Sequence, residues 1–355
     1  MNSAHERLNR GAGLALLAAA LFGASTPFSK LLLRALDPIL LAGMLYLGSG
    51  IGLAVWRVIS RAGRDRGREA SLKLADLPWL AGAIASGGVA GPVLLMFGLR
   101  TTPASSSSLL LNLEGVLTAM LAWFVFKENF DLRIALGMAA ISAGGVLISW
   151  GGYPQPGAAV GTLSITGACL AWAIDNNLTR RVSAGDPVQV AAAKGLIAGA
   201  VNLTIAIASG SAMPGVGVVA AAALVGLAGY GISLTLFVLA LRHIGTARTG
   251  AYFSVAPFIG AAISILVLRD QVTGYFLAAA GLMGFGVWLH LTERHRHEHL
   301  HAEIEHDHAH IHDEHHRHGH EEAVPDGASH SHAHRHSEMQ HSHRHYPDIH
   351  HRHEH

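Results

Sequence analysis

Three ionisable side chains lie inside long apolar stretches of this sequence, where their charges could do chemistry. They are Glu114, Asp175 and Lys194. Ionisable groups inside a membrane are costly and usually face a bundle interior or a wet cavity. Carboxylates in such a cavity could bind a cation or an amine, or carry a proton. The structural alternative is an ion-paired cluster that locks helices together.

Polar neighbours extend this group of candidates. Asn112 lies two residues before Glu114, and Asn176 follows Asp175 directly. Tyr252 could line a cavity, although helix packing is the simpler role for a buried tyrosine. We therefore expect substrate binding or coupling, and no catalysis, from Glu114, Asn112, Asp175, Asn176, Lys194 and Tyr252.

The composition indicates a protein embedded in a lipid bilayer. Hydrophobic residues make up 50% of the 355 residues and charged residues only 14%, against about 25% in soluble domains. Basic residues cluster in short segments, a pattern typical of membrane topology and not of nucleic-acid binding. The single cysteine, Cys169, excludes an intramolecular disulfide. No nucleotide-binding loop, nucleophile elbow or zincin motif indicates an enzyme.

Ten apolar stretches are long enough to cross a bilayer, which takes about 20 residues of helix. The first could be mistaken for a secretory signal, but its apolar run continues to Leu33 and the helix count balances only if it stays. The predicted fold is all-α, with spans at 11–33, 38–59, 78–99, 104–126, 132–150, 158–180, 187–209, 215–241, 246–268 and 273–290.

The basic residues predict how these spans are oriented. The loop after the second span holds Arg57, Arg61, Arg64, Arg66, Arg68 and Lys73. Lysine and arginine stay on the cytoplasmic side of short loops. We therefore expect both termini in the cytoplasm and the chain in the cytoplasmic (inner) membrane.

An internal repeat divides the spans into two halves. Leu99-Arg100 reappears as Leu241-Arg242, and Lys127-Glu128 reappears as Arg269-Asp270, both after 142 residues. Five spans in each half make the second half enter the membrane inverted relative to the first. The predicted domains are a cytoplasmic N-terminus at 1–10, five-helix repeats at 11–150 and 158–290, and a tail at 291–355.

Two five-helix halves, each with a basic-acidic pair after its fourth helix, resemble the EamA-type members of the drug/metabolite transporter superfamily. The resemblance covers residues 11 to 290 and implies export of a small solute. The family usually has a proline in the middle of the fourth helix of each half. Pro257 fits this pattern, whereas the first half has Asn112-Leu113-Glu114-Gly115 at the matching place.

The tail holds most of the 26 histidines, mixed with Asp and Glu. Its composition predicts disorder in the absence of a ligand. Imidazoles bind Zn, Ni, Co and Cu, so we expect the tail to bind Ni, Co or Zn. The alternative is a solubilising tail. The candidate metal ligands are His306, His308, His310, His312, His315, His316, His318, His320, His330, His332, His334, His336, His341, His343, His345, His350, His351, His353 and His355.

The sequence favours a secondary transporter that exports a small molecule or a divalent metal ion by alternating access and needs no cofactor to do so. The tail would then be a buffer, a sensor or a funnel for ions. The alternative is a membrane-anchored metal-binding or sensing protein that transports nothing. A homodimer and a monomer are both compatible with the sequence.

Overall fold

The computed structural model describes residues 2–61, 76–126, 132–150, 158–179 and 187–292, and four short segments of the tail. Most of the basic loop, at 62–75, and the pair Lys127-Glu128 lie outside the described residues. The backbone alone is described for 2–9, for most of 241–248 and for the tail segments.

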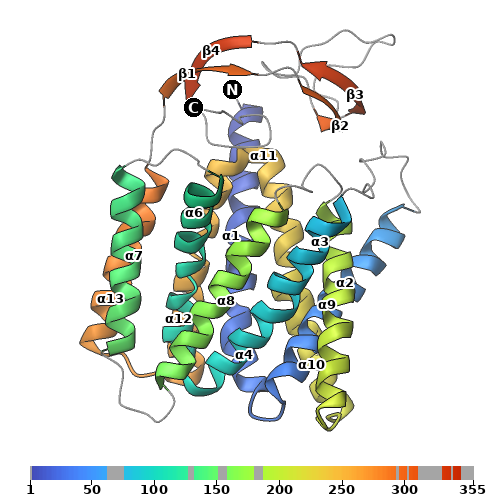
Figure 1. Cartoon of the computed structure of the whole chain (residues 1–355), viewed down its shortest axis with the longest axis vertical. Coiled ribbons are helices and arrows are strands. Elements are labelled where there is room, and N and C mark those ends of the chain that lie inside the picture. Colours follow the sequence, from blue (N-terminus) through green and yellow to red (C-terminus); the bar gives the residue numbers. More distant parts are fainter. Residues whose placement is uncertain are drawn as a thin grey trace.

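Helices run back and forth along one bundle (Figure 1). We call the end at which α1 begins the N-terminal end, and the opposite end the far end. The first half of the chain contains α1 (Asn2–Leu32), α2 (Pro38–Arg61), α3 (Leu77–Ala83), the π-helix η2 (Ile84–Ala90), α4 (Gly91–Thr101), α5 (Ala104–Leu110), α6 (Leu113–Phe126) and α7 (Leu132–Trp150).

The second half follows a similar order. It contains α8 (Ala158–Thr179), α9 (Pro187–Ala208), α10 (Val216–Gly226), the π-helix η4 (Leu227–Ile232), α11 (Ser233–Phe253), α12 (Ala256–Leu268) and α13 (Gly274–Leu291).

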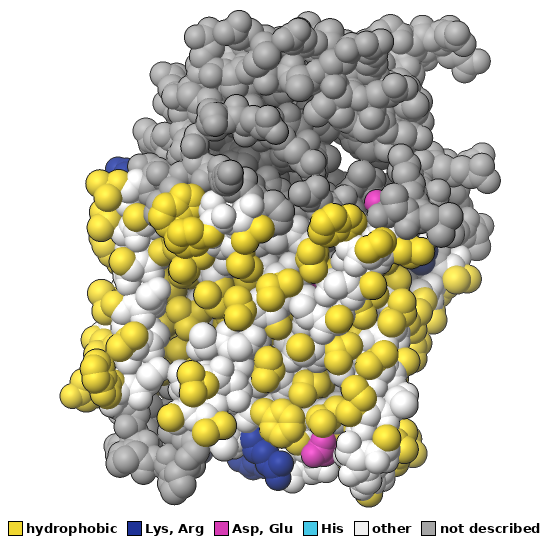
Figure 2. Space-filling view, viewed as in Figure 1, with side chains coloured by type: hydrophobic (Ala, Val, Ile, Leu, Met, Phe, Trp, Pro, Cys, Tyr) yellow, Lys and Arg dark blue, Asp and Glu magenta, His cyan; other side chains and the backbone are white. Residues whose placement is uncertain are grey.

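Nine helical segments in the described part of the chain are long and apolar enough to cross a membrane. Each matches one of the ten expected spans within a few residues. The remaining expected span corresponds to α8, a 22-residue helix whose last turns carry Asp175, Asn176 and Asn177. These polar residues lower its mean hydropathy. Hydrophobic side chains cover the flank of the bundle, and the charged ones seen from this side lie near its two ends (Figure 2).

Two kinds of irregularity interrupt the helices at matching places in the two halves. The π-helix η4 lies within one residue of where η2 would fall after a shift of 142 residues. The break between α5 and α6 at Leu111 and Asn112 likewise corresponds to the break before α12 at Ser254 and Val255. At each break a side chain donates to the carbonyl three residues earlier: Asn112 Nδ2 to Leu109 O at 2.9 Å, and Ser254 Oγ to Ala251 O at 2.8 Å. The sequence predicted neither π-helix.

Small residues let α2 and α9 pack with their backbones in close contact. Gly43 and Gly50 on α2 face Gly195 and Gly199 on α9. Helix association in a bilayer depends on such close packing, because lipid tails are as apolar as side chains. A Cβ added to Gly199 would lie 2.6 Å from the backbone nitrogen of Leu47, too close for any real contact.

The tail contains two pairs of antiparallel strands outside the helix bundle. β1 (Arg296–His301) pairs with β4 (Met339–Arg344), and β2 (Ile304–His310) pairs with β3 (His330–His336). The disorder expected in the absence of a ligand stays a prediction. Histidine alternates with other residues along β3, and this period of two suits a strand, in which alternate residues share a face. The remaining residues of the tail lie outside the described residues.

We predict that Gly199→Val abolishes assembly of the bundle, because the new side chain would separate α2 from α9. Gly217→Val is the control, since no atom lies within 4 Å of a Cβ at Gly217. Size-exclusion chromatography in detergent should show several-fold less monodisperse protein for Gly199→Val than for Gly217→Val. Equal yields would contradict this account of the interface.

Candidate functional site

Glu114 lies at the middle of a membrane span and directly after a break in it. The span covers Ala104–Val125, and Glu114 is the second residue of α6. The turn at Leu111 and Asn112 frees carbonyl groups from the helical ladder. Asn112 Nδ2 donates to Leu109 O, and the thiol of Cys169 lies 3.6 Å from Leu110 O. These contacts hold the break that places Glu114 against α8.

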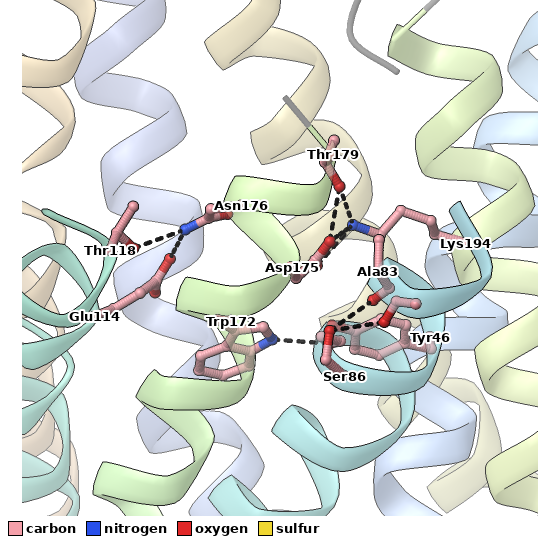
Figure 3. Close-up of polar contacts among 12 residues, drawn as sticks. Tyr46, Ala83, Ser86, Glu114, Thr118, Trp172, Asp175, Asn176, Thr179 and Lys194 are labelled. Atoms are coloured by element: carbon pink, nitrogen blue, oxygen red, sulfur yellow. Dashed lines mark hydrogen bonds and ion pairs between the residues drawn. The ribbon is translucent and has the colours of Figure 1, made fainter. Parts of the chain in front are cut away.

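Asn176 on α8 is the hydrogen-bond partner of Glu114. Its Nδ2 donates to Glu114 Oε1 at 2.9 Å and lies 3.4 Å from Thr118 Oγ1, one turn further along α6 (Figure 3). We call Glu114, Thr118 and Asn176 the carboxylate cluster. It offers a carboxylate, an amide and a hydroxyl to a bound molecule.

The carboxylate cluster faces the interior of the bundle. Four apolar residues of α8, at the spacing of one helix face, are exposed on its outer side: Val160, Leu163, Leu170 and Ile174. Asn176 is also exposed, but it lies two residues after Ile174, which rotates it to the opposite side of the helix at about 100° per residue. Asn176 is therefore exposed on the side of α8 away from this apolar row, where it contacts the half-buried Glu114.

Asp175 and Lys194 form an ion pair on another face of α8. Lys194 Nζ on α9 lies 2.5 and 2.6 Å from the two carboxylate oxygens of Asp175. Thr179 donates to Asp175 Oδ1 at 2.8 Å and lies 3.3 Å from Lys194 Nζ. Each charge has its partner, and Asp175 is buried at 7% exposure. With both charges paired, the geometry is that of a structural ion pair that links α8 to α9.

Two aromatic side chains between these groups share one acceptor in η2. Tyr46 Oη and Trp172 Nε1 both donate to Gly87 O, at 2.8 and 2.9 Å (Figure 3). Asn202 Nδ2 donates to the next carbonyl, Gly88 O, at 3.2 Å. A π-helix leaves carbonyls outside the regular ladder, and in a membrane these must find another donor. Sequence inspection missed this arrangement because nothing in the Ser-Gly-Gly segment signals a π-helix.

A row of aromatic rings continues from Tyr46 into the second half of the chain. The ring centroids of Tyr46 and Tyr230 are 5.5 Å apart, those of Tyr230 and Phe22 are 6.0 Å apart, and those of Phe22 and Phe253 are 5.6 Å apart. These residues come from α1, α2, η4 and α11, so the row joins four elements at the centre of the bundle.

The other two candidates lie apart from the carboxylate cluster. Asn112 is buried, and its amide lies between Leu109 O and the sulfur of Met283 on α13. Tyr252 is half-buried on α11 and takes no part in the contacts drawn in Figure 3. Of the six predicted site residues, the structure joins Glu114 with Asn176 and Asp175 with Lys194.

Comparisons with known proteins give the chain a family. A model of the EamA-like transporter family matches residues 9–150 and again residues 159–292. An uncharacterized transporter of Methanothermobacter thermautotrophicus is 27% identical over 263 residues, which is 70% of this chain and 76% of that protein.

A solved crystal structure of a protein with no stated function has a similar fold. Its TM-score is 0.57 at 18% identity, and the match covers 79% of this chain and 95% of that one. The two family matches include all the helices that hold the carboxylate cluster and confirm the resemblance inferred from the sequence. The chain belongs to the EamA-like transporter family.

Proposed function

We propose that this membrane protein is a secondary transporter that moves a small solute past the carboxylate cluster by alternating access of two inverted halves. The observation that carries the proposal is the position of Glu114. It lies at mid-span and accepts a hydrogen bond from Asn176, whose side chain is exposed. A carboxylate placed there is expensive to bury and is a functional group by default.

The packing of the helices supports the inverted repeat. In the first half, α3, η2 and α4 form the third span, and α5 and α6 form the fourth. In the second half, α10, η4 and the start of α11 form the eighth span, and the end of α11 and α12 form the ninth.

The first span of each half makes equivalent contacts with the other half. The first span packs on the eighth and ninth spans, and the sixth span packs on the third and fourth. The second and seventh spans pack on each other, as do the fifth and tenth. Exchanging the two halves leaves this pattern unchanged.

The ligand atoms of the cluster limit the solute. A carboxylate, an amide and a hydroxyl suit an amine, a proton or a hydrated cation. Among the described residues no group of three or more His, Cys, Asp and Glu side chains could hold a metal ion. A dehydrated Ni or Zn ion would therefore find few of its preferred ligands along the described bundle.

The basic residues support the orientation of the bundle, and the family resemblance supports the direction of transport. We place the N-terminal end of the bundle in the cytoplasm because α2 ends and α3 begins there (Figure 1), and the basic loop joins them. Export from the cytoplasm across the inner membrane is the direction that the family resemblance favours.

We predict that Glu114→Gln abolishes transport while the amount of folded protein stays near normal. The substitution keeps the size and the hydrogen bonding of the side chain and removes its charge. Untargeted mass spectrometry of cells with and without the chain would identify the solute whose level changes. The same measurement on cells that express Glu114→Gln should match cells without the chain. Normal transport by a well-expressed variant would rule out this role for Glu114.

We predict the opposite behaviour for the ion pair of Asp175 and Lys194. Asp175→Asn leaves the ammonium of Lys194 unpaired, a change that costs roughly 3 to 5 kcal/mol at buried sites. Thermal unfolding in detergent should show a marked drop in Tm. The double variant Asp175→Asn, Lys194→Met should recover most of it. Loss of transport by Asp175→Asn at unchanged Tm would instead place Asp175 in the solute site.

We also propose that the tail binds Ni, Co or Zn ions. In the pair of β2 and β3, histidine lies opposite histidine at three positions: His306 with His334, His308 with His332, and His310 with His330. The backbone register therefore brings histidine positions of the two strands together in pairs. The tail would then serve as a buffer, sensor or funnel beside the transport path.

We predict that removal of residues 293–355 abolishes most Ni binding by the purified protein at pH 7.5 and leaves solute transport in place. Binding by the full chain should weaken below about pH 6, because protons compete for imidazole nitrogens. Isothermal titration calorimetry measures both effects. If truncation also ended transport, the alternative of a membrane-anchored metal-binding protein would be favoured.

A further inference from the structure

We propose that Lys30 and Asp270 hold the far end of the transport path closed by binding the turn between α4 and α5. The inference rests on the proposed transport function and assigns it two gating residues. The turn consists of Thr102 and Pro103. It lies at the end of the bundle opposite to the start of α1 (Figure 1).

Lys30, near the end of α1, binds one side of this turn. Its ammonium donates to Leu99 O and also lies 3.3 Å from Arg100 O and 3.1 Å from Thr102 O. These carbonyls belong to the last turn of α4 and the residue after it, where the partial charge of a helix is negative. A cation from α1 thus neutralises the end of a helix that belongs to another span.

Asp270, which follows α12, binds the other side. Its Oδ2 accepts a hydrogen bond of 2.8 Å from the backbone nitrogen of Ser105, in the first turn of α5. The backbone N–H groups of a first turn lack partners in the helix, and a carboxylate satisfies them. The turn therefore receives a cation where one helix ends and an anion where the next begins.

The two side chains belong to elements that pack on each other and on α5. A Cβ on Gly23 of α1 would lie 2.4 Å from Ala256 O of α12, and one on Gly260 would lie 2.8 Å from Ser108 Oγ of α5. Gly161 near the start of α8 is equally close to Thr101 and Thr102. α12 thus packs on α1 and on α5, and α8 contacts the turn itself.

Burial along the fourth span agrees with closure at the far end. On α5 nearly every residue is buried, among them Ser105 and Ser108 at 1% exposure and Ser107 at 0%. Glu114 and Thr118, further toward the N-terminal end, are half-exposed, and Asn176 beside them is exposed. The buried residues of α5 thus lie between the carboxylate cluster and the far end. To open the far end, the turn must separate from Lys30 and Asp270.

Cysteine labelling can test this assignment in the full-length protein. The reporter is Thr118→Cys in a Cys169→Ser background, because Thr118 is a half-buried member of the carboxylate cluster and the native thiol is buried. A membrane-impermeant maleimide is applied to right-side-out and to inverted vesicles. The measurement is the ratio of the labelling rates from the two sides.

We expect the reporter to be labelled mainly from the N-terminal end of the bundle. Asp270→Asn and Lys30→Met should each shift the ratio toward the far end by about tenfold, the factor that corresponds to one hydrogen bond to a charged group. Asp37→Asn is the matched control, since Asp37 accepts from Ile39 N at 3.0 Å within its own helix start and joins no second element by that bond.

Three results would overturn the assignment, and each has a different consequence for the proposed transport. Labelling from both sides that neither Lys30→Met nor Asp270→Asn changes would refute the gating role and leave alternating access in place. Labelling from one side in every variant would refute the gate and the proposed transport mechanism together. If Asp37→Asn shifted the ratio of labelling rates equally, the shift would reflect a general destabilisation of the far end and not the loss of a gate.

Discussion

Every backbone polar group inside a bilayer must find a partner within the protein, and the arrangement of this bundle follows from that requirement. Regular α-helix satisfies most of these groups, but the π-helices and the helix ends leave some carbonyl groups without a backbone hydrogen-bond donor. In the first half these carbonyls are bonded by side chains from other helices. Tyr46 and Trp172 bind Gly87 O, Asn202 binds Gly88 O, and Lys30 binds the end of α4. Each irregularity therefore fixes the position of a neighbouring helix.

Three consecutive polar residues of α8 point in different directions, and each has a distinct role in our account. Asp175 turns to α9 and is neutralised by Lys194, so it holds two helices together. Asn176 lies toward α6 and donates to the carboxylate of Glu114. Asn177 donates to Ala173 O of its own helix at 2.8 Å and lies 3.4 Å from Thr118 O of α6. Whether a polar side chain of α8 links helices or can bind a solute therefore depends on the partner that it contacts.

The two halves share their backbone irregularities and differ in their side chains. Asn112 and Ser254 support equivalent breaks with equivalent hydrogen bonds. Glu114, however, corresponds to Ala256, and Ala256 lies against Gly23 of α1 in a close helix contact. Ala256 is buried at 1% exposure, so the larger side chain of a glutamate at this position would displace its neighbours. The two halves can therefore share their backbone irregularities while only the first half carries a carboxylate after its break.

The sequence by itself determined the helical bundle, the approximate spans and the residues that are costly to bury. Hydrophobic length and charge are local properties, so Glu114, Asp175 and Lys194 stand out without any coordinates. Pairing is not local. Only the tertiary structure decided that Glu114 meets Asn176, that Lys194 neutralises Asp175, and that Lys30 and Asp270 meet at one turn from positions far apart in the chain. The π-helices and the placement of Asn112 depend in the same way on partners supplied by other helices, because each carbonyl left free needs a donor from elsewhere.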